Sequence, residues 1–479
     1  MELYLDNIGI IKESKVEING LTVITGKNKS GKTTVGKVVY SLIRANGNVE
    51  KEFVRSRNAY IFSKLNEVSS LILAREAYLY RFKQKEEPLT DTELMLFILG
   101  NRNYGSYSSE KLFSFLHDVK NGLASLTYEN VRDISDRDAT HIDRDSFEDQ
   151  KLYDFFERRK QHAIKICSDA INIVEDSRAY DIFSFDRLKK FLNLSFCNQI
   201  NPVKNAKAIG HVRLDNAGQN LVELIIHNKS NFEVLNSNPI ILPYNQSIFI
   251  DDPFILDRLQ EKRYGSLSFG VNESPIYSID AVSHRDYLIQ LLLMKAPVNF
   301  FDNLELQKKY SSLFEKMNVI VPGEFQETKE GMFYVDDNAK LNVQNLATGS
   351  KLFFIIKMLL LNGNLNDETV LILDEPESHL HPEWINKFAE ILVLLIRELK
   401  LCIMLTTHSP NLLLALEFYV KAYGIKKQAH FYLARPVAEE DWASCLECID
   451  DNINKGYAHL SLPLVEMSIM QKAAEEKGY

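Results

Sequence analysis

The sequence predicts an α/β fold with a mixed, mostly parallel sheet, an antiparallel β sublobe and a mainly helical insertion. Strand-like segments within residues 1–25 lead directly into a glycine-rich loop and a helix. Residues 48–204 are rich in charged and aromatic residues at helical spacing, with few strand signals. From Thr348 onward helix and strand patterns alternate, which is typical of a parallel sheet flanked by helices.

The composition is that of an ordinary globular chain of two or three structural units. The chain has 479 residues, of which 45% are hydrophobic, and a formal charge of −9. That charge predicts no strong global attraction to nucleic acid or to anionic membranes. The N-terminus lacks a secretory pattern, no apolar run is long enough to span a bilayer, and the five cysteines are irregularly spaced. We therefore expect a cytoplasmic protein without a membrane segment, in which Cys445 and Cys448 are incidental thiols rather than zinc ligands.

The first 204 residues divide into a strand-rich start and a helical stretch. Strands are expected over 2–6, 15–19 and 21–25, followed by a helix whose apolar face runs from Val35 to Ile43 and which stops at Gly47. Helical spacing then predicts helices over 63–85, 90–100, 110–126 and 147–176, with a charged connection over 131–146. No long heptad run occurs, so we expect a compact helical insertion rather than an extended coiled coil.

The remainder of the chain alternates between strand and helix signals. Strands are expected over 208–216, 221–228, 231–237, 318–322, 331–337 and 340–344, and helices over 280–293 and 306–317. The alternating part that follows predicts helices over 349–363, 382–400 and 409–424, and strands over 369–375, 401–407 and 430–436. The last residues, from about 450, are expected to form a short helical cap.

The loop between the strand at 21–25 and the next helix has the composition of a phosphate-binding loop. GKNKSGKT fits the pattern GxxxxGK[ST] and lies between a strand and a helix, as that motif requires. Backbone N–H groups and the helix N-terminus favour an anion there. The lysine is expected to reach the terminal phosphates of ATP and the threonine to bind Mg²⁺. The candidate nucleotide-binding residues are Gly26, Asn28, Ser30, Gly31, Lys32, Thr33 and Thr34.

Two later strands end in side chains suited to the chemistry of a bound nucleotide. The apolar run TVLILDE ends in Asp374, a candidate Mg²⁺ ligand beside Thr33, and in Glu375, which is placed to polarise an attacking water. His408 follows the strand LCIMLTT and is a candidate for contacting the γ-phosphate or that water. A solvated strand end and an ordinary loop histidine are the alternative interpretations. Glu375 and His408 are the candidate catalytic residues.

The two histidines of ESHLHP suggest a metal site at first. His379 and His381 are two residues apart and follow Pro376, so they do not lie at i and i+4 on one helix face. This spacing weakens a zinc interpretation based on HExxH.

As a set, these motifs resemble the ABC-type ATPase heads of the SMC, RecF and OLD group. Walker A, signature, Walker B and His-switch motifs occur there in the order found here at Gly26–Thr33, Leu346–Lys351, Leu371–Glu375 and His408. NLATGSK, LILDEPESHLHPEW and LTTHSP are similar to the stand-alone OLD-like ATPases (the AAA_15 and AAA_21 groups, without a Toprim domain) of antiphage defence. These include the ATPase subunits of the Septu, PARIS and retron-associated systems.

The resemblance implies that two heads sandwich ATP, each nucleotide held by Walker A of one chain and the signature of the other. The signature has Ala347 where the family has serine, so Thr348, Gly349 and Ser350 are the candidates for that contact. This departure implies slow turnover. His379 and His381 would lie in the D-loop at the dimer seam. Gln246 is a candidate for the Q-loop glutamine.

The domain organisation that follows is a head interrupted by an insertion. Its first part is 1–47, the insertion is 48–204, the remainder of the head is 205–435, and 436–479 is a short C-terminal helical cap. No acidic DxD strand motif follows His408, so any nuclease activity is expected to belong to a separate protein.

The resulting functional prediction is a cytoplasmic ATPase that uses ATP and Mg²⁺. By resemblance it forms a homodimer or higher oligomer and regulates a separately encoded nuclease or toxin effector in antiphage defence. The alternative is a RecF- or SMC-like ATPase of DNA repair or maintenance, with DNA as a partner. A membrane importer is disfavoured by the long insertion, and a decayed nucleotide site by the intact Lys32, Asp374 and Glu375.

Overall fold

The computed structural model describes most of the chain as two structural units. Unit 1 contains Met1–Gly47 and Phe185–Tyr479, and unit 2 contains Asn48–Ser184. The described residues are 1–72, 107–127, 146–202, 204–205, 207–228, 231–235, 242–259, 283–293, 310–328, 331–336, 340–437 and 440–476. The predicted helix over 90–100 and nearly all of the predicted connection over 131–146 lie outside them.

A large mixed sheet forms the centre of unit 1. In the described part of the chain it has 11 strands in the order β6-β5-β4-β1-β2-β14-β13-β3-β12-β11-β7. The strands are β1 (Glu2–Ile8), β2 (Ile11–Glu17), β3 (Leu21–Thr25), β4 (Gly210–Asn216), β5 (Gln219–Asn228), β6 (Asn231–Val234), β7 (Gln246–Ile250), β11 (Thr369–Asp374), β12 (Cys402–Thr407), β13 (Ala429–Val437) and β14 (Glu440–Cys448). The predicted α/β class is thus confirmed.

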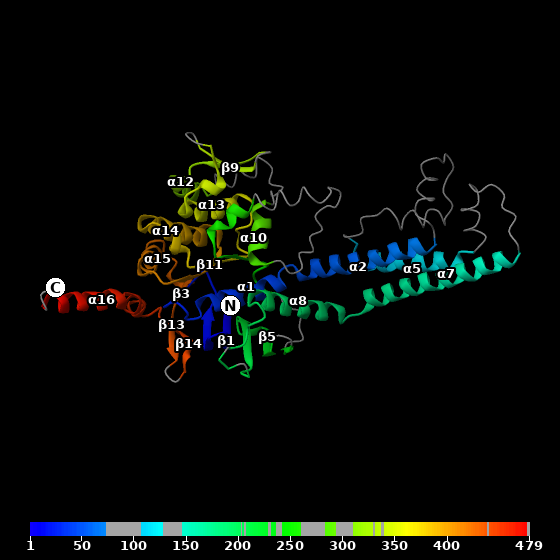
Figure 1. Cartoon of the computed structure of the whole chain (residues 1–479), viewed down its shortest axis with the longest axis horizontal. Coiled ribbons are helices and arrows are strands. Elements are labelled where there is room, and N and C mark those ends of the chain that lie inside the picture. Colours follow the sequence, from blue (N-terminus) through cyan, green and yellow to red (C-terminus); the bar gives the residue numbers. More distant parts are fainter. Residues whose placement is uncertain are drawn as a thin grey trace. The chain divides into compact units, whose positions relative to one another are not determined.

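One half of this sheet is parallel and is covered on both faces. Strands β13, β3, β12, β11 and β7 pair in parallel. Ile372 and Met404 pack on the side of α1 (Lys32–Asn46), whereas Leu371 and Leu405 pack against the opposite layer. That layer contains α13 (Thr348–Leu361), α14 (Pro382–Leu399) and α15 (Pro410–Ala422), which Figure 1 shows together above the sheet. Burial on both faces explains why these strands are continuous apolar runs.

The register of the parallel strands brings their carboxyl ends together at one edge. Asp374 of β11 pairs with Thr406 of β12, and Thr407 pairs with Thr25 at the end of β3. On the other side of β11, Leu373 pairs with Ile250, the last residue of β7. Sheets of this kind bind ligands at the carboxyl ends of their strands.

The other half of the sheet is antiparallel, with one buried face. Strands β6, β5, β4, β1 and β2 pair in antiparallel fashion, as expected for the β sublobe. Their inward residues, such as Leu3, Leu5 and Val212, share a core with α1. Alternation between buried and outward-facing residues is typical of a sheet covered on one side only.

A second, three-stranded sheet contains β8 (Glu324–Thr328), β9 (Gly331–Val335) and β10 (Lys340–Asn342).

The prediction of a strand over 318–322 is wrong, because α12 (Ser311–Ile320) continues through Ile320. The buried ammonium of Lys357 donates to Asn318 Oδ1 at 2.8 Å and to the carbonyls of Val321 and Gly323 at 3.0 Å. Burial lowers the pKa of this lysine. These tertiary contacts outweigh the strand preference of the β-branched residues.

Unit 2 is a helical bundle in its described part. Helices α2 (Val49–Ile72), α5 (Ser109–Ser125) and α7 (Ser146–Glu175) lie side by side (Figure 1). Their core includes Ile61, Leu116 and Cys167. The predicted helices over 110–126 and 147–176 correspond to α5 and α7.

Helix α8 (Ala179–Ser195) returns the chain to unit 1. Its Arg187 is buried and donates from Nε to the carbonyl of Ala45 at 2.7 Å and from Nη2 to that of Arg44 at 3.0 Å. These carbonyls end α1, where backbone acceptors lack helical partners and a cation is favourable. The unit boundary lies at Ser184, whereas the predicted insertion continues to residue 204.

The end of the chain contains one strand that the sequence analysis did not predict. Strand β14 pairs antiparallel with β13 and reaches β2 through the pair Ser444–Ile11. Helix α16 (Asn454–Glu476) follows it. In the part of the chain that the structure describes, every helix is too short or too polar to cross a bilayer.

Candidate functional site

The phosphate loop joins β3 to α1 through residues 26–31. Gly26, Lys29 and Gly31 have positive φ angles of 156°, 62° and 85°. The positive φ favours glycine at position 31, and an added Cβ would lie 2.5 Å from Ile11 Cδ1, so the Ile11 side chain would have to shift. No side chain caps the N-terminus of α1.

Replacing Gly31 by alanine is expected to destabilise the fold. Positive φ costs an L-residue about 1–2 kcal/mol, and overpacking against Ile11 adds about 1–3 kcal/mol. Gly363→Ala is the matched control, because Gly363 has a φ of 70° but no atom within 4 Å of an added Cβ. Chemical denaturation should therefore show a larger loss for Gly31→Ala. Equal losses in the two variants would contradict the packing argument.

Lys32 is held in the loop although its side chain is almost fully buried. Its Nζ donates to the carbonyls of Gly26 and Lys27 at 3.0 and 2.9 Å, and lies 3.3 Å from Glu375 Oε1. A buried ammonium is tolerated only with such partners. The lysine is therefore held at the loop's centre, beside the predicted water-activating carboxylate.

Asp374 is fixed between the loop and β12. Thr33 Oγ1 lies 3.0 and 2.9 Å from its two carboxylate oxygens, and Thr406 Oγ1 donates to Oδ1 at 2.6 Å. Burial raises the pKa of Asp374, against the effect of these hydrogen bonds. A dication would offset the same desolvation.

Glu375 and His408 adjoin this pair. Glu375 has a left-handed backbone, with φ 49°, and its N–H donates to the carbonyl and hydroxyl oxygens of Thr406 at 3.2 and 3.1 Å. His408 Nδ1 lies 3.4 Å from Glu375 Oε2 and 3.6 Å from Glu377 Oε1. The structure thus brings Lys32, Thr33, Asp374, Glu375 and His408 together, although they come from three segments of the chain.

The donor set fits Mg²⁺ and a phosphate chain. A hydroxyl and a carboxylate, from Thr33 and Asp374, are the hard oxygen ligands that Mg²⁺ prefers. The buried hydroxyl of Ser30 has no hydrogen-bond partner within the described structure. Buried polar groups are normally satisfied, so this hydroxyl and the uncapped start of α1 are suited to an anion in the loop.

Asn28 and Thr34, also predicted to bind nucleotide, occupy different positions around the loop. Asn28 is exposed at its tip. Thr34 lies in the first turn of α1, and an added Cβ at Gly9 would lie 3.3 Å from its Cγ2.

The predicted signature residues lie at the start of α13, which is not one of the elements that carry this cluster. Ala347 is the exposed N-cap and makes no side-chain capping hydrogen bond. Thr348 and Ser350 are half-buried. Gly349 is buried against the carbonyl of His379 and the ring of Trp384, each 3.1 Å from an added Cβ.

The two histidines of the predicted D-loop have distinct contacts. The ring of His379 packs edge-on against Phe254 with centroids 5.7 Å apart. His381 caps α14, because its Nδ1 accepts from the N–H of Glu383 at 3.3 Å. Both side chains are exposed.

Gln246 does not lie at the site. It begins β7 and pairs with Thr369 at the amino end of β11.

The carboxyl end of β7 leads to Asp251, a residue that the sequence analysis did not identify. Burial would raise the pKa of Asp251, but hydrogen bonds from His284 and Arg285 outweigh it and lower the pKa to about 2. The only sequence signal was the acidic pair ending SIFIDD.

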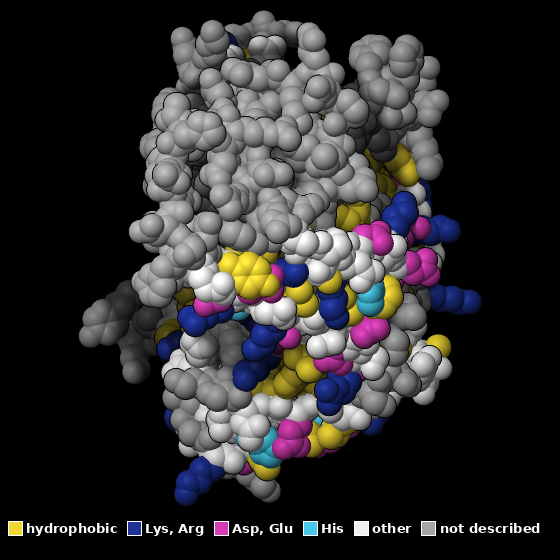
Figure 2. Space-filling view, turned by 90° about the vertical axis from the view of Figure 1, so that its right-hand side faces the viewer, with side chains coloured by type: hydrophobic (Ala, Val, Ile, Leu, Met, Phe, Trp, Pro, Cys, Tyr) yellow, Lys and Arg dark blue, Asp and Glu magenta, His cyan; other side chains and the backbone are white. Residues whose placement is uncertain are grey.

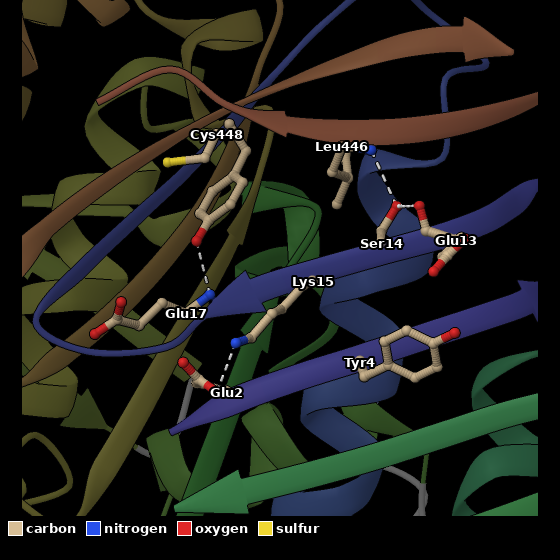
Figure 3. Close-up of a pocket in the computed structure, with 9 residues that line it drawn as sticks. Glu2, Tyr4, Glu13, Ser14, Lys15, Glu17, Leu446 and Cys448 are labelled. Atoms are coloured by element: carbon tan, nitrogen blue, oxygen red, sulfur yellow. Dashed lines mark hydrogen bonds and ion pairs between the residues drawn. The ribbon is translucent and has the colours of Figure 1, made fainter. Parts of the chain in front are cut away.

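A separate pocket of about 560 Å³ lies on the antiparallel side of the sheet (Figure 3). Tyr4 and Lys15 line it, and Lys15 pairs with Glu2 at 2.8 Å. Cys448 lies at its border, and both it and Cys445 are free thiols of β14. None of the predicted nucleotide-site residues lines this pocket.

Solved structures similar to this chain include SMC heads, at low similarity. The SMC head domain from Thermotoga maritima is 10% identical, with 94% of this chain and 98% of that chain covered and a TM-score of 0.35. The SmcHead bound to the C-winged helix domain of ScpA is 9% identical, with 93% and 96% covered and a TM-score of 0.38. These TM-scores are too low to support an argument about function. No curated protein matches the chain.

A family profile matches the second part of the head. Residues 210–415 match the family described as "AAA domain, putative AbiEii toxin, Type IV TA system". The matched range contains Asp374, Glu375 and His408, three of the residues that the fold assembles beside the phosphate loop. Residues 210–415 are therefore similar to an AAA domain.

Proposed function

We propose that the protein binds ATP with Mg²⁺ and hydrolyses it at the edge formed by β3, β12 and β11. The observation that carries this proposal is the contact of Thr33 with both carboxylate oxygens of Asp374, at 3.0 and 2.9 Å. It joins the phosphate loop to a strand end more than 300 residues later, in the arrangement that Mg²⁺–phosphate binding requires.

Each side chain of the cluster has a distinct role in this reaction. Lys32, released from the loop carbonyls, neutralises charge on the terminal phosphates. Thr33 and Asp374 hold Mg²⁺, which neutralises phosphate charge when it is bound. Glu375 accepts a hydrogen bond from the attacking water and orients it. His408 lies next to Glu375, where it contacts the water or the γ-phosphate.

The proposal includes a dimer in which the start of α13 faces the nucleotide of the other copy. Ala347 is exposed, and the helix N-terminus behind it has no side-chain cap. Such a terminus attracts an anion. The hydroxyls of Thr348 and Ser350 are the candidates for contact with the partner-bound γ-phosphate, and the carbonyl of His379 lies beside Gly349.

A pair of substitutions at Ala347 tests this dimer. Ala347→Asp supplies a good helix cap worth about 1 kcal/mol, but places a negative charge where the partner's phosphate would approach. Ala347→Ser supplies a similar cap without the charge. We expect both variants to be at least as stable as the wild type. Only Ala347→Asp should lose ATP-dependent dimerisation, measured by light scattering with a non-hydrolysable ATP analogue. Dimerisation by Ala347→Asp would contradict the arrangement.

We further propose that the nucleotide state regulates a separately encoded effector in antiphage defence. The motif resemblance supports this role, and the matched family description also names a toxin–antitoxin system. In the described part of the face in Figure 2, basic and acidic side chains are interspersed. Phage challenge of cells that express the chain with its neighbouring gene, with and without Lys32→Ala, tests the role. Equal phage sensitivity with and without the intact pair would contradict it.

A further inference from the structure

We propose that Glu377 is a positioning residue that holds the imidazole of His408 for the ATPase reaction. The inference rests on the proposed function and adds to it a carboxylate that the motif comparison left without a role. Glu377 lies in the 3-10 helix η3 (Pro376–His379), two residues after Glu375, and only 6% of its surface is exposed.

One oxygen of Glu377 binds the end of strand β12. Its Oε1 accepts from Thr407 Oγ1 at 2.6 Å and from the backbone N–H of His408 at 3.0 Å. The hydroxyl of Thr407 in turn accepts from the N–H of Ser409 at 3.0 Å. These contacts fix the backbone from which the His408 side chain extends.

The other features of Glu377 point to the imidazole itself. His408 Nδ1 is 3.6 Å from Glu377 Oε1 and 3.4 Å from Glu375 Oε2, so the ring nitrogen lies beside two carboxylates. The second oxygen of Glu377, Oε2, is buried without a hydrogen-bond partner in the described structure. A buried carboxylate oxygen in this state is costly unless a donor reaches it. The Nδ1 of His408 approaches this carboxylate at Oε1, 3.6 Å away, and a small shift of the ring would bring its N–H within hydrogen-bond distance of Glu377.

A carboxylate on Nδ1 determines which tautomer the histidine adopts. When Nδ1–H donates to Glu377, the proton of the neutral ring is on Nδ1 and Nε2 is left to contact the water or phosphate. The ring orientation is fixed at the same time. Carboxylates that hold functional histidines in this way act through the histidine and need not touch the substrate.

The substitution Glu377→Gln distinguishes a role in positioning His408 from a purely structural role. A glutamine at 377 keeps one carbonyl oxygen, which can accept from Thr407 and from the His408 N–H. It loses the negative charge and the second acceptor oxygen. A purely structural role therefore predicts that Glu377→Gln retains activity, whereas a positioning role predicts a loss.

The test measures ATP binding and turnover for Glu377→Gln, His408→Ala and the double variant. We expect Glu377→Gln to lower kcat about 10- to 100-fold, with ATP affinity within about twofold of the wild type. In the His408→Ala background it should have little further effect, because both substitutions remove the same function. Unchanged kcat in Glu377→Gln, or an equal fold-loss in the two backgrounds, would overturn the proposal.

A spectroscopic arm separates this proposal from the ATPase assignment. Nitrogen-15 labelled histidine, with His408 assigned by its absence in His408→Ala, reports the tautomer directly. We expect the Nδ1–H form in the wild type and a loss of that preference in Glu377→Gln. The same ring state in both proteins would overturn the positioning role even if ATP is hydrolysed. Absence of hydrolysis with the expected tautomer change would contradict the proposed function alone.

Discussion

Glu375→Gln is expected to leave ATP bound while hydrolysis falls by about 100- to 10,000-fold, the usual range for losing a general base. The amide has nearly the volume of the carboxylate, but it cannot accept a proton from the attacking water. Lys32 keeps its two carbonyl partners in the variant, so the phosphate loop should stay intact. ATP turnover and nucleotide affinity, measured on the same preparation, check both parts of the prediction.

The control for this variant is Glu383→Gln, which removes an exposed carboxylate in the first turn of α14. Its turnover should equal that of the wild type. Light scattering should show that Glu375→Gln accumulates a dimer with ATP, since the bound nucleotide is no longer consumed. A variant that hydrolyses ATP at the wild-type rate would show that Glu375 is not the water-activating group.

Lys32→Ala is expected to weaken ATP binding by at least about 100-fold, which corresponds to about 2.7 kcal/mol. The substitution removes the cation at the centre of the loop. It also leaves the carbonyls of Gly26 and Lys27 without their donor. Titration with a fluorescent ATP analogue measures the affinity, and a melting curve shows whether the fold is retained.

Lys27→Ala is the matched control for the lysine substitution, because Lys27 lies in the same loop but is exposed. It removes the same charge from the chain and leaves the backbone carbonyl that Lys32 uses. Affinity should fall by only a few-fold at most. If the two variants bind ATP equally well, the assignment of the loop as the nucleotide site is wrong.

The central part of the site could be predicted because its geometry is local. Gly31 and Lys32 belong to one loop whose spacing is fixed by a strand before it and a helix after it. Asp374 and Glu375 end an apolar run, and a buried parallel strand of this composition exposes little except its end. These features depend on neighbours in the sequence, so pattern reasoning found them.

Other site residues depend on strand register, which the sequence does not state. Thr406 reaches Asp374 only because β12 pairs beside β11 in a particular register. Asp251 directly follows β7, a strand that precedes β11 by more than 100 residues and pairs on its other side. His284 and Arg285 then join Asp251 from a helix that showed only ordinary helical spacing.

Two errors of the sequence prediction, the omission of β14 and the strand predicted over 318–322, have opposite causes. Strand β14 contains few β-branched residues, and its pairing with β13 and β2 decides its conformation. Val319 and Ile320 favour strands, yet they end α12, whose Asn318 is bound by Lys357. Local preference is a weak guide where tertiary partners satisfy the backbone.

The hydrogen bonds from Arg187 of α8 to the last carbonyls of α1 have a thermodynamic consequence. Helix α1 begins at the phosphate loop, ends where the chain leaves unit 1, and has its last carbonyls bound by Arg187 as the chain returns. A molecule that binds unit 2 and shifts these two connections would therefore change the affinity for ATP. Reciprocity requires that ATP change the affinity for that molecule by the same factor.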